Sequence, residues 1–364
     1  MSEAMQARDA VLAAPPFALD ATEKNRLLGA ALAELTLHHA ANCPQYAGIL
    51  AAQGRAAPIG IADVPFLPVR LFKELDLKSI PADAVFKTLT SSGTTGQVPS
   101  RIYLDQATAQ AQSRALAAIT TNFIGKDRRP MLIIDHPGVV RDRTSFSARG
   151  AGILGMMTYG RAHIYALNDE DMGLNLPAIT EFAEKHAGKP IFAFGFTFMV
   201  WKYFLSALER AGITLDFPGS VLIHSGGWKK LEDEAVSNEQ FKSVALERAG
   251  FDHVHNFYGM VEQVGSVFME CDHGRLHAPG FADVIIRDPL DWQPLGLGQE
   301  GIIQVVSAIP LSYPGHSLLT EDRGMMTGED DCPCGRMGRT FRVLGRIPAA
   351  EMRGCSDTHT AQAA

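Results

Sequence analysis

Residues 91–96, with the sequence SSGTTG, combine hydroxyl side chains and glycine in a mixture that suits neither a helix nor a buried strand. The glycines allow the backbone to turn sharply and to expose successive N–H groups. Such concavities bind anions, and serine and threonine hydroxyls add hydrogen-bond donors around a phosphate chain. The segment lacks the Gly-Lys-Ser/Thr ending of a Walker loop, and a plain surface turn is the alternative interpretation. The residues expected to bind phosphate are Ser91, Ser92, Gly93, Thr94, Thr95 and Gly96.

A second group of residues has the types and spacing of a metal site. Cys271 is followed six positions later by His277, and Cys332 and Cys334 come later with a single proline between them. Three thiolates and one imidazole suit the tetrahedral coordination of Zn²⁺, and a closed site with four protein ligands is structural. His273 is an alternative nitrogen ligand, and two unrelated surface loops are the alternative to any metal site.

Cys355 lies near the end of the chain, directly after Arg353 and Gly354. A thiol on a short terminal segment can reach into a site, and a neighbouring arginine favours the thiolate. A thiolate that attacks an activated acyl group forms a thioester, so the protein itself becomes the acyl acceptor. The alternative is a cysteine without a role in a frayed terminus.

The elements that must position these residues follow from the spacing of apolar side chains. Apolar positions three and four apart predict mostly helical structure over residues 20–54, and an alanine-rich stretch predicts a helix over about 106–122. The hydroxyl-rich segment follows a short apolar stretch at 85–89 and precedes an alternating stretch at 100–105. It is therefore expected to be a loop that leads into a strand.

Short apolar runs predict a mostly parallel sheet in the middle of the chain. Residues 129–138 and 189–195 each begin with a basic residue and proline and end near glycine, and residues 220–228 form a similar run. Residues 253–263 are a candidate fourth strand. From about residue 283 onward, strand-like segments alternate with turn signals, which predicts a smaller and more antiparallel region. The expected fold class is α/β.

The composition is that of a globular protein and excludes several classes of function. The net charge of −7 and the pI of about 5.9 argue against a nucleic-acid partner. The densest apolar run, 191–201, is far shorter than the ~20 residues that cross a membrane, so no membrane span is expected. No secretory signal begins the chain, and its five cysteines are an odd number, so we expect a reducing, cytoplasmic location without disulfide bonds.

Taken in order, the motifs resemble those of the adenylate-forming superfamily, which includes the acyl- and aryl-CoA ligases. SSGTTG is similar to its phosphate loop, and HSGGW (224–228), FYGMVEQ (257–263), LLTEDRG (318–324) and LGRI (344–347) resemble its later motifs. The resemblance implies a site for ATP and Mg²⁺. It assigns Gly226 and Gly227 to adenine, Tyr258 to stacking near adenine, Glu262 to magnesium and catalysis, Asp322 to the ribose hydroxyls and Arg346 to the catalytic hinge.

Two departures from the superfamily pattern affect the expected site. Members usually carry a lysine shortly after the last glycine of the loop, whereas here Arg101 is the nearby cation and its role is left open. CoA ligases also continue past the hinge into a swivelling domain with a catalytic lysine, whereas this chain ends nineteen residues after Gly345. The resemblance thus implies an α/β body that binds ATP and the acyl group over 1–282, a β-rich subdomain over 283–345, and a hinge remnant with a flexible tail over 346–364.

The short length, the loop and the near-terminal Cys355 together resemble the LuxE family, the acyl-protein synthetases of bacterial bioluminescence. The resemblance implies a ligase that activates a carboxylic acid, such as a fatty acid, with ATP. It further implies that the acyl group is loaded on Cys355 and handed to a partner such as an acyl reductase. The pattern of cysteines and histidine resembles one in phenylacetate-CoA-ligase-like relatives, whose spacing favours His277 as the fourth zinc ligand.

Two alternatives to self-acylation stay open at this point. One is a truncated acyl- or aryl-adenylating ligase that passes its product to CoA or a carrier protein and leaves Cys355 idle. The other is a nucleotide-binding regulatory module that has lost catalysis. The presence of Glu262 and Asp322 argues against the regulatory module.

Overall fold

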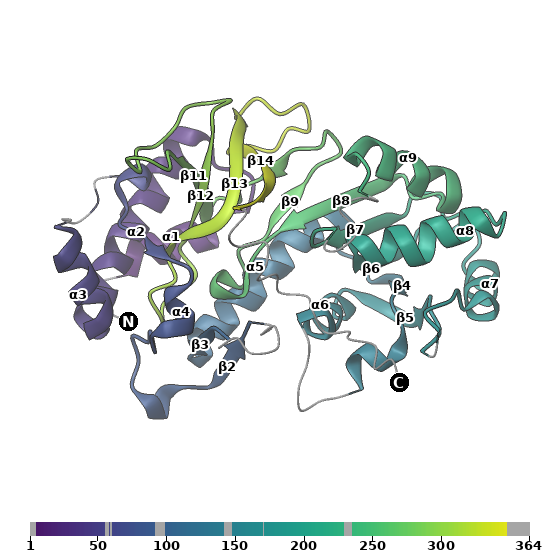
Figure 1. Ribbon diagram of the computed structural model, residues 1–364, viewed down its shortest axis with the longest axis horizontal. Helices are drawn as coiled ribbons and strands as arrows, with labels where there is room; N and C mark the ends of the chain where they lie inside the picture. Colours follow the sequence, from purple (N-terminus) through teal and green to yellow (C-terminus); the bar gives the residue numbers. More distant parts are fainter. Residues whose placement is uncertain are drawn as a thin grey trace. The chain divides into compact units, whose positions relative to one another are not determined.

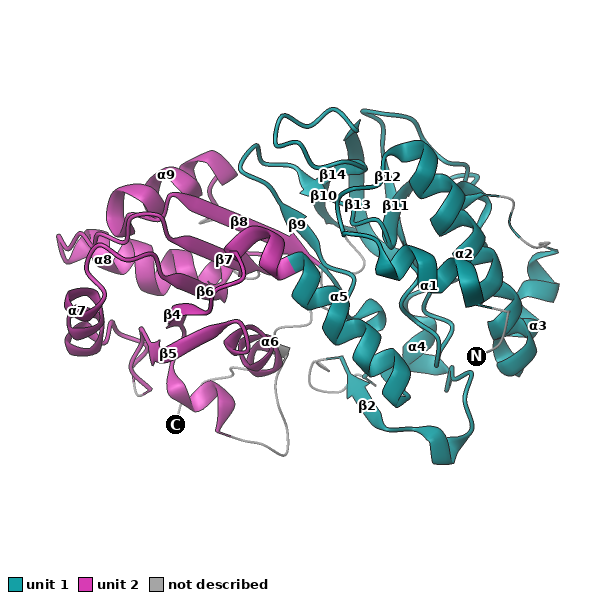
Figure 2. Cartoon of the chain, turned by 180° about the vertical axis from the view of Figure 1, so that it is seen from behind, with its two compact units in different colours: residues 1–119, 259–355 teal, residues 120–258, 356–364 magenta. Residues whose placement is uncertain are grey.

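A computed structural model describes residues 5–54, 58, 60–91, 99–141, 148–169, 171–228 and 235–347. The chain falls into two compact units, which Figure 2 shows in different colours. Unit 1 combines residues 1–119 with 259–355, and unit 2 combines residues 120–258 with 356–364. Unit 1 is therefore built from two long segments that are far apart in the sequence. The domain boundaries expected at residues 282 and 345 stay a prediction.

Unit 2 is built on a sheet in which every pairing is parallel. Its strands lie side by side in the order β8-β7-β6-β4-β5. β4 and β6 are almost entirely buried, which is typical of parallel strands and explains their continuous apolar sequences. The strands of this sheet are β4 (Arg129–Ile134), β5 (Gly160–Tyr165), β6 (Phe192–Phe196), β7 (Val221–Ser225) and β8 (His253–Tyr258).

Two of the helices of unit 2 begin at residues whose side chains cap them. The Asn175 side chain accepts a hydrogen bond from the Ala178 amide, and the Ser237 hydroxyl accepts one from the Gln240 amide. β6 leads into a π-helical turn at Met199–Leu205, so the apolar run at 191–201 is a strand followed by a helix. The helices are α6 (Ala148–Met157), α7 (Leu176–Lys185), α8 (Ser206–Arg210) and α9 (Asn238–Ala249), labelled in Figure 1.

Unit 1 contains an antiparallel sheet with strand order β11-β12-β13-β14-β10-β9. A two-residue strand, β1 (Leu67–Pro68), adds a parallel pairing to β13, and β2 (Lys87–Thr90) forms a separate antiparallel pair with β3 (Arg101–Leu104). The remaining strands are β9 (Phe268–Glu270), β10 (Leu276–His277), β11 (Ala282–Arg287), β12 (Glu300–Ser307), β13 (Ser317–Glu329) and β14 (Arg339–Arg346). The predicted antiparallel region is thus confirmed.

The predicted N-terminal helical region is also present in unit 1, as two helices separated at Cys43. α2 begins at Ala21, where Asp20 accepts a hydrogen bond from the Glu23 amide, and α3 begins with Pro44. The helices that begin in unit 1 are α1 (Gln6–Ala13), α2 (Ala21–Asn42), α3 (Pro44–Gln53), α4 (Leu71–Glu74) and α5 (Gln106–Ile124). Among the helices of the described residues, none combines the length and the apolar character that a membrane crossing requires.

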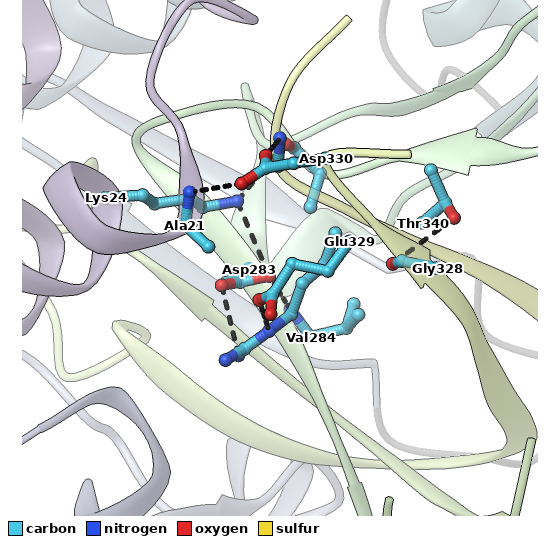
Figure 3. Close-up of polar contacts among 11 residues, drawn as sticks. Ala21, Lys24, Asp283, Val284, Gly328, Glu329, Asp330 and Thr340 are labelled. Atoms are coloured by element: carbon cyan, nitrogen blue, oxygen red, sulfur yellow. Dashed lines mark hydrogen bonds and ion pairs between the residues drawn. The ribbon is translucent and has the colours of Figure 1, made fainter. Parts of the chain in front are cut away.

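A buried ion pair joins α2 to the antiparallel sheet (Figure 3). Lys24 Nζ lies 3.4 Å from Asp283 Oδ1, and Arg339 binds the other oxygen of the same carboxylate at 3.3 Å. Burial lowers the pKa of Lys24, whereas Asp283 opposes this shift. Asp330 accepts hydrogen bonds from the amides of Ala21 and Gly338, so it ties the start of α2 to the connection between β13 and β14.

Candidate active site

Two serines close the base of the hydroxyl-rich loop. The Ser91 amide donates to the Ser100 carbonyl oxygen at 3.2 Å, and the Ser100 amide donates to the Ser91 hydroxyl at 2.8 Å. These bonds extend the β2–β3 pairing, which ends at Thr90 opposite Arg101. The hydroxyl-rich segment therefore lies between two antiparallel strands, and the strand expected after it is present. The other residues assigned to phosphate lie outside the described residues: Ser92, Gly93, Thr94, Thr95 and Gly96.

Glu262 lies in a short 3₁₀ turn at Val261–Gln263 and is 7% exposed. Burial raises the pKa of its carboxyl group, and the Ser100 hydroxyl, Lys73 and Arg346 partly oppose this rise. A carboxylate that is buried in this way is stabilised by any cation that binds it. Ser100 therefore connects the base of the loop to the carboxylate that the motif assigns to magnesium.

Buried polar atoms without a hydrogen-bond partner surround this carboxylate. Tyr313 is fully buried, and its hydroxyl makes no hydrogen bond of ordinary length and angle within the described part of the chain. The same holds for the Gln112 side-chain nitrogen and the Ser100 hydroxyl, although these groups still act on the pKa values of Tyr313 and Glu262. Burial and the neighbouring Glu262 raise the pKa of Tyr313, and Gln112 opposes this shift. Unpartnered buried polar groups are rare and costly in proteins, so their concentration near Glu262 indicates a site for a polar ligand or ion.

Two glycines allow the segments around Glu262 to approach closely. Gly265 has φ +92°, and a Cβ atom there would lie 2.8 Å from the Gln112 Cα of α5. A Cβ atom at Gly315 would overlap the Tyr313 ring and would lie 2.9 Å from the Glu262 carbonyl oxygen. The side-chain nitrogen of Gln263 donates a hydrogen bond to the Gly315 carbonyl oxygen at 2.9 Å. Glycine is thus required where the two segments pack against each other.

Asp322 and Arg346 form a pair across neighbouring strands. They are register partners in β13 and β14, and Arg346 Nε lies 3.4 Å from Asp322 Oδ1. The Asp322 amide also donates to the Thr320 hydroxyl at 3.1 Å. The residues assigned to the ribose and to the hinge are therefore in contact, a relationship that the motifs alone did not predict.

The remaining motif residues belong to unit 2. Gly226 and Gly227 directly follow β7, and Tyr258 is the last residue of β8. These two strands are parallel neighbours in which Ser225 pairs with Phe257, so the glycines and the tyrosine lie at the same edge of the sheet. Ligands of open α/β sheets bind at the carboxyl ends of the strands, which is where these residues lie.

The four residues of the expected metal site come together in unit 1. The ligand atoms of Cys271, His277, Cys332 and Cys334 all lie within 4.8 Å of one another. Cys271 and Cys332 are 3.7 Å apart at their sulfur atoms, and Cys334 Sγ lies 3.4 Å from His277 Nε2. His273 is exposed and is not part of this cluster.

The surroundings of the cluster hold it in place. Burial, together with Arg336 and Arg275, lowers the pKa of His277 to about 4, so the imidazole is uncharged at neutral pH. Phe17 packs edge-on against His277, and the Met337 amide donates to the Phe17 carbonyl oxygen. The segment before α2 thus covers the cluster.

The structure gives Arg101, whose role was left open, a partner, whereas the role expected of Cys355 stays a prediction. Arg101 forms a 2.8 Å ion pair with Asp76, and the described cation that acts on Glu262 from the N-terminal segment is Lys73. Cys355, the proposed acyl acceptor, lies outside the described residues. No motif surrounds Lys73, Gln112 and Tyr313, and their residue types are common, so the sequence did not identify them. Ser100 was identifiable only as the first residue of the alternating stretch that follows the loop.

Comparison with known proteins gives a family for the chain. A family model described as the acyl-protein synthetase LuxE matches residues 2–363. A long-chain-fatty-acid–luciferin-component ligase from Vibrio harveyi is 24% identical over 306 residues, which cover 81% of this chain and 76% of that protein. The ligase of the same name from Aliivibrio fischeri is 22% identical over 303 residues, which cover 81% of this chain and 78% of that protein.

Solved structures share the fold. The open conformation of 2-hydroxyisobutyryl-CoA ligase, in complex with 2-HIB-AMP and CoA, has a TM-score of 0.69 and 16% identity. The match covers 91% of this chain and 77% of that chain. The postadenylation state of the same ligase with 2-HIB-AMP gives a TM-score of 0.68 at 16% identity and covers 92% of this chain and 70% of that chain. The predicted adenylate-forming fold is confirmed. Because the family model matches nearly the whole chain, this protein belongs to the LuxE family of acyl-protein synthetases and is a ligase.

Proposed function

We propose that this protein uses ATP to convert a fatty acid into an acyl-AMP and then transfers the acyl group to its own Cys355. The observation that carries the adenylation step is the buried Glu262 at the base of the hydroxyl-rich loop, surrounded by buried polar atoms that lack partners. The names of the relatives from Vibrio harveyi and Aliivibrio fischeri support a long-chain fatty acid as the substrate.

Adenylation must bring two anions together. A carboxylate oxygen of the acid attacks the α-phosphorus of ATP, the bond from this phosphorus to the bridging oxygen breaks, and pyrophosphate leaves. The N–H groups and hydroxyls of residues 91–96 would stabilise the charge that grows on the phosphate oxygens. Asp322 would hold the ribose hydroxyls, with Arg346 as its ion-pair partner.

Glu262 and the loop hydroxyls would hold Mg²⁺, which when bound screens the phosphate charge from the attacking carboxylate. The residues near Glu262 fit this ion, because oxygen ligands and ordered water are what Mg²⁺ prefers. The Ser100 and Tyr313 hydroxyls are buried, unpartnered groups that could hydrogen-bond to such water. Tyr313 and Gln112 then act as positioning residues for the Glu262 carboxylate.

Transfer to Cys355 completes the proposed reaction. The thiolate attacks the acyl carbon, the bond from this carbon to the AMP oxygen breaks, and AMP leaves with that oxygen. The resulting thioester would serve a partner such as an acyl reductase. Support for this step comes from the LuxE family membership and from the position of Cys355 in the sequence.

The cysteine and histidine cluster would hold a structural Zn²⁺. Three sulfur ligands and one nitrogen ligand are typical of closed zinc sites. Bound zinc would fasten the connection between β13 and β14 to β10 and to the segment before α2. The odd number of cysteines in the sequence supports the proposed cytoplasmic location.

Intact-protein mass spectrometry tests the proposed function. The full chain is incubated with ATP, Mg²⁺ and a panel of carboxylic acids of different lengths, aliphatic and aromatic. We expect an ATP-dependent mass increase equal to the acyl group, largest for long-chain fatty acids. Pyrophosphate exchange without any protein adduct would instead favour the truncated ligase, with CoA or a carrier-protein thiol as the acceptor.

A further inference from the structure

Unit 2 contains a pocket with five cationic side chains, at the amino ends of its parallel strands. The pocket has a volume of about 330 Å³. We name it the basic pocket, defined by Lys126, Arg128, Arg129, Arg161 and Lys189. Arg129 begins β4, Arg161 is the second residue of β5, and Lys189 shortly precedes β6. The register pairs Pro130 with Arg161, so neighbouring strand starts bring these cations together.

Two of the arginines are already oriented by the backbone. Arg129 donates from one terminal nitrogen to the Gly219 carbonyl oxygen at 3.0 Å, and Arg161 donates from Nε to the Arg128 carbonyl oxygen at 2.8 Å. A guanidinium group has five N–H donors, so each of these side chains keeps donors for another acceptor. A side chain that is held in place loses less conformational entropy when it binds a ligand.

The lining of the basic pocket contains more cations than carboxylates. Asp127 is the one carboxylate in its lining, and no ion pair joins any of the five cations to a carboxylate in the described ranges. Elsewhere in unit 2, Arg141 pairs with Asp169 and Arg149 with Asp135. Like charges that lie close together repel each other, so this pocket is locally positive although the whole chain has a net charge of −7.

The effect of these charges extends to a neighbouring side chain. Burial lowers the pKa of His186, and Lys185, Arg161 and Lys189 lower it further. The electrostatic potential near the pocket is therefore positive, and an anion bound there would remove the repulsion.

We propose that the basic pocket binds the phosphate group of a small organic phosphate. The planar guanidinium groups match the geometry of phosphate oxygens, and lysines add point charges. Buried Ile124 and Pro130, with Pro190, give the pocket an apolar part that an organic body can contact. Its volume lies at the small end of the range for ligand pockets, which favours a small molecule over a protein surface.

The basic pocket is distinct from the part of the proposed ATP site that lies in unit 2. Gly226 and Tyr258 lie at the carboxyl ends of β7 and β8, whereas the pocket lies at the amino ends of β4, β5 and β6. Strands of this length span roughly 17–20 Å, so the two sites are at opposite edges of the same sheet. The basic pocket therefore does not include the unit 2 residues that are assigned to ATP.

Isothermal titration calorimetry on the full chain at low salt tests the proposal. The probes are adenosine 3′,5′-bisphosphate and inorganic phosphate. Comparing them shows whether the pocket prefers an organic phosphate or the free anion. The double variant Arg161→Gln/Lys189→Gln removes two cations of the pocket. The control, Arg114→Gln/Arg210→Gln, removes the same charge from exposed positions outside it.

We expect the wild type and the control to bind adenosine 3′,5′-bisphosphate equally, and the pocket variant to bind at least about tenfold more weakly. Tighter binding of inorganic phosphate than of the bisphosphate would identify the free anion as the ligand and overturn the organic part of the proposal. The thermal unfolding midpoint of the pocket variant without probe should be unchanged or raised, and its pyrophosphate exchange should be retained. Failure of both probes to bind the wild type, or equal binding by the pocket variant, would overturn the proposal.

Discussion

Asp322 and Arg346 face each other across β13 and β14, with 3.4 Å between Arg346 Nε and Asp322 Oδ1. A change at either residue therefore alters the surroundings of the other. We expect Asp322→Ala and Arg346→Ala each to lower carboxylate-dependent ATP–pyrophosphate exchange by about tenfold or more. The loss of transition-state stabilisation in the double variant should be smaller than the sum of the losses in the two single variants, by about 0.5 kcal/mol or more.

The neighbouring ion pair supplies the control for this cycle. Arg323 lies next to Asp322 in β13 and pairs with Glu300 at 2.8 Å, at exposed positions. Arg323→Ala should leave exchange within about twofold of the wild type, because exposed ion pairs contribute little. Strict additivity of the Asp322 and Arg346 changes would contradict a functional pair.

Glu262→Gln should lower exchange by roughly 100-fold, because the uncharged amide cannot bind a metal ion as a carboxylate does. The same variant tests the pKa. Burial raises the pKa of Glu262 above its ordinary value of 4.5, so the folded protein binds this proton more tightly than the unfolded chain. The stabilisation that this proton provides is fully present below the ordinary pKa and is lost as the pH rises through the raised value.

Denaturant unfolding without Mg²⁺ measures this effect. Between about pH 4 and pH 7 the free energy of unfolding of the wild type should fall relative to that of Glu262→Gln. Added Mg²⁺ and ATP should raise the free energy of unfolding of the wild type at the higher pH, but not that of Glu262→Gln. Parallel pH curves for the two proteins would show that the carboxyl group has an ordinary pKa.

Tyr313→Phe removes a buried hydroxyl that has no hydrogen-bond partner within the described part of the chain. We expect the free energy of unfolding to stay the same or to rise by about 1 kcal/mol, because an unsatisfied group is lost. If this hydroxyl positions a water molecule bound to Mg²⁺ near Glu262, ATP–pyrophosphate exchange should nevertheless need a higher Mg²⁺ concentration to reach half of its maximal rate.

Tyr46 is the matched control, because it is equally buried but its hydroxyl lies 3.3 Å from His316 Nε2. Tyr46→Phe should lower the free energy of unfolding by about 1 kcal/mol and leave the Mg²⁺ dependence of exchange unchanged. If the two variants behave alike in both measurements, Tyr313 has only a structural role.

Protein purified without chelators should contain about one zinc per chain. Cys332→Ser should lower both the zinc content and the thermal unfolding midpoint, because the free energy of metal binding stabilises the fold. Cys43→Ser should keep its zinc, since Cys43 is buried between α2 and α3, away from the cluster. Full zinc content in a variant without Cys271, Cys332 and Cys334 would overturn the assignment.

The sequence predicted four of the five parallel strands, β4, β6, β7 and β8, as short runs between turn signals. It missed β5, whose sequence GRAHIY is not a continuous apolar run and which is only partly buried. It predicted β13 poorly, since Glu321, Asp322 and Arg323 are charged and Gly324 has a low strand propensity. Pairing with β12 and β14 on either side forms this strand despite its sequence. The motif pattern located Asp322, but not the strand that carries it.

The four cysteine and histidine ligands were predictable because metal ligands have characteristic spacings. The surroundings of Glu262 were not, because Ser100, Gln112 and Tyr313 come from separate segments and carry no motif. The basic pocket could be predicted from the sequence only in part. Its basic-proline pairs, Arg129-Pro130 and Lys189-Pro190, are visible in the sequence, but only the strand order brings them together.

The most direct test of the central claim is the intact mass of Cys355→Ser after incubation with ATP, Mg²⁺ and a fatty acid that acylates the wild type. In the proposed mechanism, adenylation uses groups from residues 91–346 and none from the tail, so pyrophosphate exchange should be nearly unchanged. The acyl adduct, which hydroxylamine should remove from the wild type, should be absent, because a serine hydroxyl stays protonated at neutral pH and cannot replace the thiolate. Acylation of Cys355→Ser to the level of the wild type would contradict self-acylation at Cys355.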